Sequence, residues 1–296
     1  MKVRLLGTAA GGGFPQWNCA CALCVACRAG TAHVPPRNQD CLAISADGVE
    51  WYLVNASPDI RAQVNTEPSL APGPGPRDTP LRGVLLTDAE LDHTLGLTLL
   101  REGAGLSVWA PPAVLDALES RFPIRGTVAR YGDWSWQQPG SSIAGLRLSS
   151  LPVSDKRPKY ARDSGVEGPW VVAYRFEDPA TGGALVYAPC LATWPPGFDE
   201  FLAGASCVLL DGTFFSPKEM TGAGTSTGAQ RAMGHLPIDG PDGSLARIRA
   251  STESSTRWMY THLNNTNPVL DRRSPEYRLV VDAGVELPLD GTALDL

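Results

Sequence analysis

The sequence lacks long apolar runs. The longest ones, such as residues 207–210 and 279–281, are far shorter than the roughly 20 residues that a membrane-spanning helix requires. Residues 1–7 also lack the apolar core and small-residue cleavage site of a signal peptide. We therefore expect a cytoplasmic protein that does not bind a membrane.

The sequence also lacks a block of basic residues. It has 25 Lys and Arg against 31 Asp and Glu, which gives a formal net charge of −6. Proteins that bind nucleic acid or anionic membranes present a basic patch, so neither partner is expected and a small molecule is favoured. Because 43% of the residues are hydrophobic and only 19% are charged, disorder and fibres are excluded as well.

Helical windows are few, whereas short β-type runs recur along the whole chain. The expected helices cover residues 92–102, 111–121, 198–205 and 244–249. The expected strands cover residues 3–6, 41–44, 51–55, 83–86, 106–109, 146–151, 171–176, 184–187, 207–210, 259–263 and 278–281. This mixture predicts an α/β sandwich. With no low-complexity linker near residue 150, we expect one domain, 1–296, with two pseudo-symmetric halves of about 1–150 and 151–296.

Four of the seven cysteines lie within nine residues: Cys19, Cys21, Cys24 and Cys27. They are too crowded for a disulfide framework, and thiolates at this spacing suit a tetrahedral zinc ion. The alternatives are small buried hydrophobic residues or a redox pair. If Cys27 is not the fourth ligand, a histidine must be, and only His33, His93, His235 and His262 exist.

Polar donors follow three of the expected strands. Asp88, Glu90 and Asp92-His93 come after residues 83–86, Asp211 ends the run 207–210, and His262 lies at the end of 259–263. Each feature alone also fits an acidic first helical turn, a turn Asp or a structural His. Three strand ends offering N or O donors in one α/β domain together indicate a divalent metal site.

The positions of Asp92-His93, Asp211 and His262 resemble the metallo-β-lactamase superfamily, whose first motif reads His-x-His-x-Asp-His. More narrowly, several longer segments are similar to the B-protein family of pyrroloquinoline quinone (PQQ) biosynthesis. These segments are residues 7–19, 55–61, 99–103, 233–235 and 262–268. The resemblance implies an αββα four-layer sandwich over nearly the whole chain.

Superfamily hydrolases bind two metals, and the resemblance implies that one of these positions is lost here. Asp88 and Glu90 replace the first two histidines of the motif, and no histidine lies near residues 153–155, where the third is expected. Asp92, His93, Asp211 and His262 match the second position. Two imidazoles with carboxylates and vacant positions suit one non-haem Fe(II) ion.

The family resemblance implies an iron-dependent hydroxylase. Its co-substrate would be O₂, and its substrate a small peptide-derived Glu–Tyr crosslinked amino acid. The alternatives are a PQQ carrier or release protein and a phosphodiesterase-like hydrolase. Glu90 is expected to act as a proton shuttle, a partner that orients His93 or an extra ligand, and it could also mark a paralogue with another substrate.

The resemblance also supports structural zinc at Cys19, Cys21 and Cys24 with a distant histidine. His235 is the first choice for the fourth ligand and Cys27 the alternative, whereas His33 is expected in an exposed loop. The basic segment 151–162 is expected at the site mouth, or else as a solvated loop. Candidate ligands for substrate carboxylates are Arg61, Arg101 and Arg157. A homodimer is left open.

Overall fold

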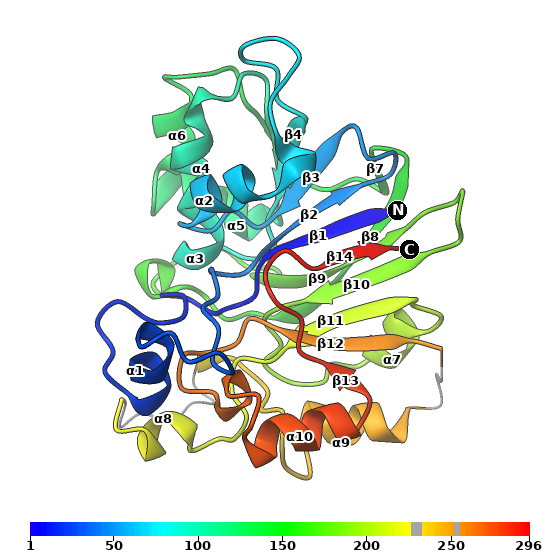
Figure 1. Ribbon diagram of the computed structural model, residues 1–296. Coiled ribbons are helices and arrows are strands. Elements are labelled where there is room, and N and C mark those ends of the chain that lie inside the picture. Colours follow the sequence, from blue (N-terminus) through cyan, green and yellow to red (C-terminus); the bar gives the residue numbers. More distant parts are fainter. Residues whose placement is uncertain (226–232, 252–254) are drawn as a thin grey trace.

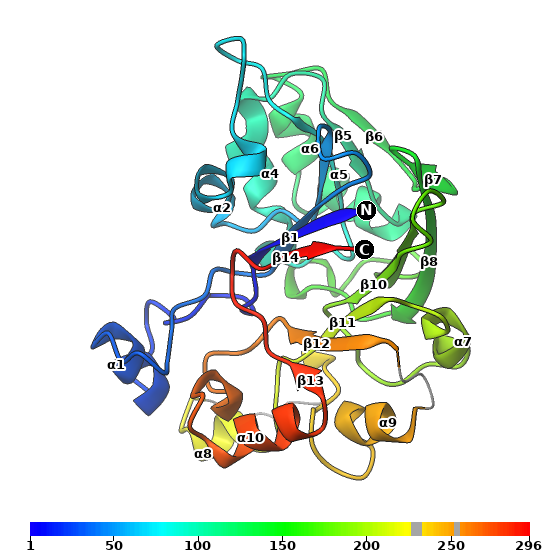
Figure 2. The same cartoon turned by 45° about the vertical axis from the view of Figure 1, so that its right-hand side comes forward.

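Two facing β-sheets form the centre of the protein, and helices cover their outer sides (Figures 1 and 2). The computed structural model describes residues 1–225, 233–251 and 255–296. The first sheet has the order β14-β1-β2-β3-β4-β5-β6 and the second has the order β13-β12-β11-β10-β9-β8-β7. The predicted αββα four-layer sandwich is confirmed.

The strands of the first sheet are β1 (Lys2–Gly7), β2 (Cys41–Ser45), β3 (Trp51–Val54), β4 (Leu81–Leu85), β5 (Ser107–Trp109), β6 (Ser135–Gln137) and β14 (Ala293–Asp295). Those of the second are β7 (Ser142–Ile143), β8 (Leu146–Ser154), β9 (Val171–Glu177), β10 (Ala184–Ala188), β11 (Cys207–Asp211), β12 (Arg257–Thr261) and β13 (Val285–Glu286). Strands β1 to β3 are antiparallel and β3 to β6 parallel. The second sheet repeats this pattern, with β7 to β10 antiparallel and β10 to β13 parallel.

Helices α2 (Ile60–Thr66), α4 (Gly96–Leu99), α5 (Pro112–Ser120) and α6 (Ile124–Val128) lie beside the first sheet (Figure 2). Helices α7 (Phe198–Leu202), α9 (Ser244–Ala250) and α10 (Pro275–Asp282) lie beside the second. Three further helices are α1 (Ala22–Arg28), α3 (Leu91–Thr94) and α8 (Glu219–Gly222). Single 3₁₀ turns lie at η1 (Pro68–Leu70), η2 (Leu100–Glu102), η3 (Lys159–Ala161) and η5 (Pro268–Leu270). Among the described residues, we find no helix with the length and apolar character needed to cross a bilayer.

Several strands are buried on both faces, which explains their nearly continuous apolar sequences. In β2, Leu42 and Ile44 pack between the sheets, whereas Cys41 and Ala43 belong to the core under the helices. Because successive side chains of a strand point to opposite faces, a strand covered on both sides needs apolar residues at every position.

Two expectations from the sequence differ from the structure. Residues 278–281, expected as a strand, lie in α10, because the Ser274 hydroxyl accepts a hydrogen bond from Tyr277 N (2.9 Å) and Pro275 occupies the first turn. The helix expected over 92–102 is divided into α3, α4 and η2. At this division Gly96 packs so closely on the preceding loop that an added Cβ would lie 2.3 Å from Ser57 O.

The carboxyl ends of parallel strands place the polar loops. Strands β4, β10, β11 and β12 end at residues 85, 188, 211 and 261, and the residues that follow them line one common pocket. The buried Asp40, just before β2, joins the two sheets here by accepting hydrogen bonds from Tyr187 Oη and Thr261 Oγ1 of the second sheet. Open α/β sheets bind their ligands at such strand ends.

Candidate metal centre

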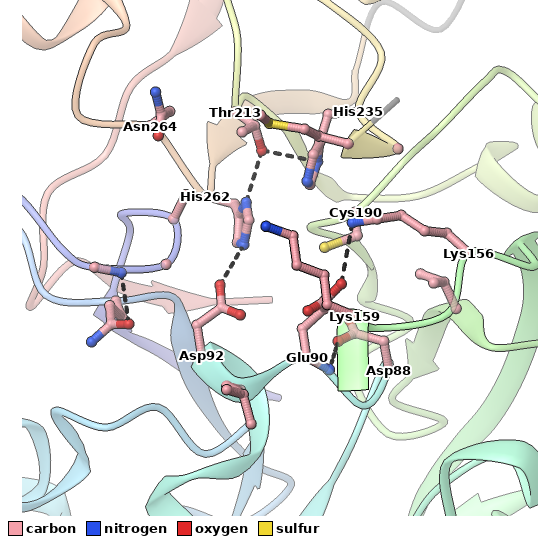
Figure 3. Close-up of a pocket in the computed structure, with 18 of the residues that line it drawn as sticks. Asp88, Glu90, Asp92, Lys156, Lys159, Cys190, Thr213, His235, His262 and Asn264 are labelled. Atoms are coloured by element: carbon pink, nitrogen blue, oxygen red, sulfur yellow. Dashed lines mark hydrogen bonds and ion pairs between the residues drawn. The ribbon is translucent and has the colours of Figure 1, made fainter. Parts of the chain in front are cut away.

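The pocket at these strand ends has a volume of about 770 Å³. Its lining includes Asp88, Glu90, Asp92, Cys190, His235 and His262, and Figure 3 shows these side chains gathered around one space. Pockets of 300–1,000 Å³ commonly hold small ligands. The described structure therefore offers room for a substrate directly above the polar side chains.

His93 is the third of the four residues of helix α3 and is fully buried. Its Nδ1 lies 2.7 Å from Asp88 Oδ2, and Asp88 is held in turn by Thr87 Oγ1 (2.7 Å) and Glu90 N (2.9 Å). The other ring nitrogen, Nε2, has no hydrogen-bond partner among the described residues and lies 4.0 Å from Asp92 Oδ2. A carboxylate that fixes one histidine nitrogen while the other remains free is typical of metal ligands.

Buried charges set the protonation of this part of the pocket. Burial alone would lower the pKa of His93, but the carboxylates of Asp88 and Asp92 raise it to about 10. Burial would raise the pKa of Asp92, and the imidazoles of His93 and His262 outweigh this effect, so that the pKa lies well below its usual value. In the metal-free protein His93 is therefore an imidazolium between two carboxylates.

His262 has a positive φ of 56°, which is unusual for a non-glycine residue. In this conformation the ring points into the pocket, between Asp92 of α3 and Thr213 in the loop after β11. Its Nε2 lies 3.3 Å from Asp92 Oδ2 and its Nδ1 lies 2.8 Å from Thr213 Oγ1. Left-handed backbone costs about 1–2 kcal/mol per residue and is found at functional sites that the surrounding structure holds in place.

Asp211 contacts His235, which corrects one prediction from the sequence. Asp211 Oδ2 lies 2.7 Å from His235 Nδ1 and accepts a further bond from Leu191 N (2.7 Å). The rings of His235 and His262 stack with their centroids 5.4 Å apart. His235 is therefore part of this pocket, and the prediction that it completes a zinc site with the cysteines is wrong. The sequence around His235 has no spacing motif that would predict its contact with Asp211.

Among the described residues, three groups of side chains have metal-ligand spacing, and the two in this pocket both contain His262. His93, Cys190 and His262 form one group, and Asp211, His235 and His262 form the other, with ligand atoms within 4.8 Å of one another in each. Of the four predicted iron ligands, Asp92 Oδ2 lies 4.0 Å from His93 Nε2 and 3.3 Å from His262 Nε2. Asp211 groups with His262 and His235, and neither group joins it to Asp92 or His93. Cys190 was missed, although it too follows a strand end.

Glu90 and the predicted arginines occupy different places. Glu90 Oε1 lies 3.2 Å from Lys156 Nζ on the pocket wall, so Asp88, and not Glu90, orients His93. Arg157 lines the pocket and stacks over Trp170. Arg61 and Arg101 are not among the lining residues, because Arg61 is exposed on α2 and Arg101 stacks over Tyr131. The remaining basic lining residues are Lys159 and Arg162.

The third group, here called the cysteine group, lies around α1, which projects from one end of the sandwich (Figure 2). Cys19, Cys21 and Cys24 present sulfur atoms within 4.8 Å of one another, and Cys27 is not in this group. Asn265 Nδ2 lies 3.1 Å from Cys19 Sγ and 3.5 Å from Cys24 Sγ. An amide therefore stands beside the thiols, where the sequence suggested His235 or Cys27.

His33 is half-buried and not exposed as expected. Its Nε2 lies 3.7 Å from Asp271 Oδ1, and 27% of its side-chain surface is accessible. His33 belongs to none of the three groups that have metal-ligand spacing.

The fold and the pocket define the class of the chain. A family model described as "Beta-lactamase superfamily domain" matches residues 50–263. A diphosphatase of the PhnP family is 18% identical, with a TM-score of 0.69 over 100% of this chain and 97% of that one, and shares the fold. The protein is a metallo-β-lactamase-fold protein with side chains arranged for metal at its strand ends.

Full-length relatives are more specific. The chain is 40% identical to "Coenzyme PQQ synthesis protein B" of Pseudomonas fluorescens (strain Pf0-1) and to the protein of the same name from Azoarcus sp. (strain BH72), in each case over 100% of both chains. The crystal structure of Zn(2+)-bound PqqB from Methylobacterium extorquens is 36% identical, with a TM-score of 0.92 over 100% of both chains. The chain belongs to the coenzyme PQQ synthesis protein B family.

Asp88→Asn is expected to weaken metal binding in the pocket by about 10–100-fold, since His93 loses the charged partner that orients it. Affinity is measured by competition with a chelator of known strength. Glu90→Gln is the matched control, because Glu90 contacts Lys156 and not His93, and its affinity should stay close to that of the wild type. Equal effects of the two substitutions would contradict this assignment.

The metal-free protein is expected to lose stability as pH rises from 7 to 9. The folded-state pKa of His93 is about 10, above its ordinary 6.5, so its stabilising contribution is complete below pH 6.5 and is lost towards pH 10. The free energy of unfolding should fall by roughly 1–3 kcal/mol in urea titrations. His93→Gln should show a shallower decrease; an equal decrease in both proteins would argue against this origin.

Proposed function

We propose that the protein is a non-haem iron, O₂-dependent hydroxylase of a tyrosine-derived intermediate in PQQ synthesis. The observation that supports this proposal is the buried His93 Nε2, which has no hydrogen-bond partner and faces a second imidazole and a carboxylate. Two imidazoles with a carboxylate are the ligand set of many Fe(II) oxygenases. The proposed ligands are Asp92, His93, Asp211 and His262.

A single metal ion is favoured over a hydrolytic pair. The superfamily resemblance puts histidines of a first metal position at residues 88 and 90. In this chain Asp88 is bound to His93 and Glu90 to Lys156, so both carboxylates already have partners. The related crystal structure from Methylobacterium extorquens is Zn(2+)-bound, which supports metal binding by this family, and the first experiment below decides which metal each site holds.

Iron in this pocket would supply the activation of O₂. Asp88 would hold the proton of His93 Nδ1 and so keep Nε2 directed at the metal. His235, bound through Nδ1 to Asp211, would hold and exchange a proton at the pocket wall. The substrate carboxylates would be bound by Lys159 and Arg162 at the rim.

The proposed reaction converts an aromatic C–H bond of the tyrosine-derived ring into C–OH. The second oxygen atom of O₂ leaves as water, which takes up two protons and two electrons. An external reductant of the ascorbate class supplies the electrons.

We propose structural zinc at the cysteine group, held by the thiolates of Cys19, Cys21 and Cys24. Three sulfur atoms within 4.8 Å of one another support this assignment. The Asn265 amide lies on the same side and is placed to complete the set through its oxygen, because the amide O and N exchange on rotation.

Elemental analysis is expected to find two independent metals. Cys21→Ser should lose zinc and keep iron, because it changes only the thiol group around α1. His262→Ala should lose iron and keep zinc, because it removes an imidazole from the pocket. Loss of both metals in each variant, with normal circular dichroism, would contradict two separate sites.

Oxygen uptake tests the proposed reaction. The protein is loaded with Fe(II) without oxygen, mixed with the Glu–Tyr crosslinked substrate and ascorbate, and exposed to O₂. We expect stoichiometric O₂ consumption and a product one oxygen atom heavier by mass spectrometry, both abolished by His93→Ala. Cleavage of a phosphodiester by the zinc-loaded protein would favour a hydrolase. Tight binding of PQQ that is insensitive to His93→Ala, without O₂ uptake, would favour a carrier.

A further inference from the structure

Cys190 has no role in the mechanism above, although it lies in the wall of the pocket. It follows β10 by two residues and is 9% exposed. Figure 3 shows its sulfur pointing into the space between His262 and Asp88. Of the other buried cysteines, Cys24 and Cys27 lie in α1, whereas Cys41 and Cys207 lie in the apolar cores away from the pocket lining.

The neighbours of Cys190 are themselves arranged for a ligand. Its sulfur and the ring nitrogens of His93 and His262 lie within 4.8 Å of one another. His93 is fully buried, its Nδ1 is bound to Asp88, and its Nε2 has no hydrogen-bond partner. A buried imidazole nitrogen without a partner costs free energy unless another group binds it. A metal ion bound to His93 Nε2 would be such a group.

Asp211, one of the ligands proposed above, can bind a metal only by exchanging hydrogen bonds that it already makes. Its Oδ1 accepts hydrogen bonds from Thr213 N (2.9 Å) and Thr213 Oγ1 (2.6 Å), and its Oδ2 contacts His235 Nδ1 and Leu191 N. Both oxygens therefore have two partners each. Asp92 Oδ2 is one donor beside His93 and His262, and the Cys190 sulfur is a second donor at metal-ligand spacing from both imidazoles.

We propose that Cys190 Sγ is a direct ligand of the metal in this pocket, together with His93 and His262. A thiolate beside two imidazoles binds zinc, iron or cobalt well and binds the hard cations Mg²⁺ and Ca²⁺ poorly. The proposal rests on a metal in the pocket, as proposed above, but not on oxygen chemistry. Cys190 adds a donor that leaves fewer positions for O₂ and substrate.

The experiment uses Co(II), whose bond to a thiolate gives a charge-transfer band in the near ultraviolet. The metal-free wild type, Cys190→Ser and Cys207→Ser are each titrated with Co(II) under nitrogen. We expect Cys190→Ser to lose part of the band and to bind the pocket ion at least about tenfold more weakly. Cys207→Ser is the matched control, because it removes a buried thiol outside the pocket, and it should match the wild type. The cysteine group around α1 contributes equally to all three proteins.

A full band and unchanged affinity in Cys190→Ser would overturn the proposal. If this variant does not fold, alkylation of the wild type decides: Co(II) should protect Cys190 from iodoacetamide in peptide mass maps, and equal labelling with and without Co(II) would overturn the proposal. Oxygen uptake is a separate result. A Cys190-dependent band without any hydroxylation would retain the ligand and reject the proposed reaction.

Discussion

Compensation of buried charge is the constraint on which the site depends. Asp40, Asp88 and Asp211 are each at most 2% exposed, and Asp92 stands beside them. Carboxylates removed from water cost several kcal/mol unless positive groups or hydrogen bonds compensate them. Here the compensation comes from the imidazoles of His93 and His262 and from hydroxyl donors. A bound divalent cation replaces the protons of these imidazoles, so metal binding and the stability of this end of the sandwich are coupled.

The turn after β12 connects His262 in the pocket with the cysteine group around α1. His262 begins the turn, and Asn264 N donates a hydrogen bond to Thr213 O in the next loop. One residue further, Asn265 contacts Cys19 and Cys24, while Asn267 Nδ2 donates to Gly212 O. The cysteine group thus contacts the same turn that holds His262 in its left-handed conformation. A structural metal at the cysteines would stabilise the position of a pocket imidazole without touching the substrate.

Local patterns predicted the parts of the site that the backbone fixes. Asp92, Asp211 and His262 were found because parallel strands bring their carboxyl ends together, and the group of Cys19, Cys21 and Cys24 because its spacing fits a short loop and one helical turn. His235 and Cys190 depend on how distant loops pack, and neither has a spacing signal. The strand expected at 278–281 failed because a local cap outweighs apolar composition in an exposed helix. Arg61 and Arg101 failed because charge alone does not show which side of a helix faces the pocket.

The same charge balance would favour the single metal ion proposed above over a pair. In the motif of the superfamily that the chain resembles, histidines stand at the positions of residues 88 and 90, and they are neutral ligands for a first metal ion. Here both are carboxylates, and Asp88 is committed to His93 while Glu90 pairs with Lys156. Burial would lower the pKa of Lys156, but Glu90 raises it, so the ammonium stays charged in the pocket wall. A fixed positive charge next to Glu90 repels a second cation there, and it neutralises a carboxylate that would otherwise attract one. Replacement of two neutral ligands by an acid–lysine pair would therefore convert a position for metal into part of a surface that binds the anionic groups of the proposed substrate.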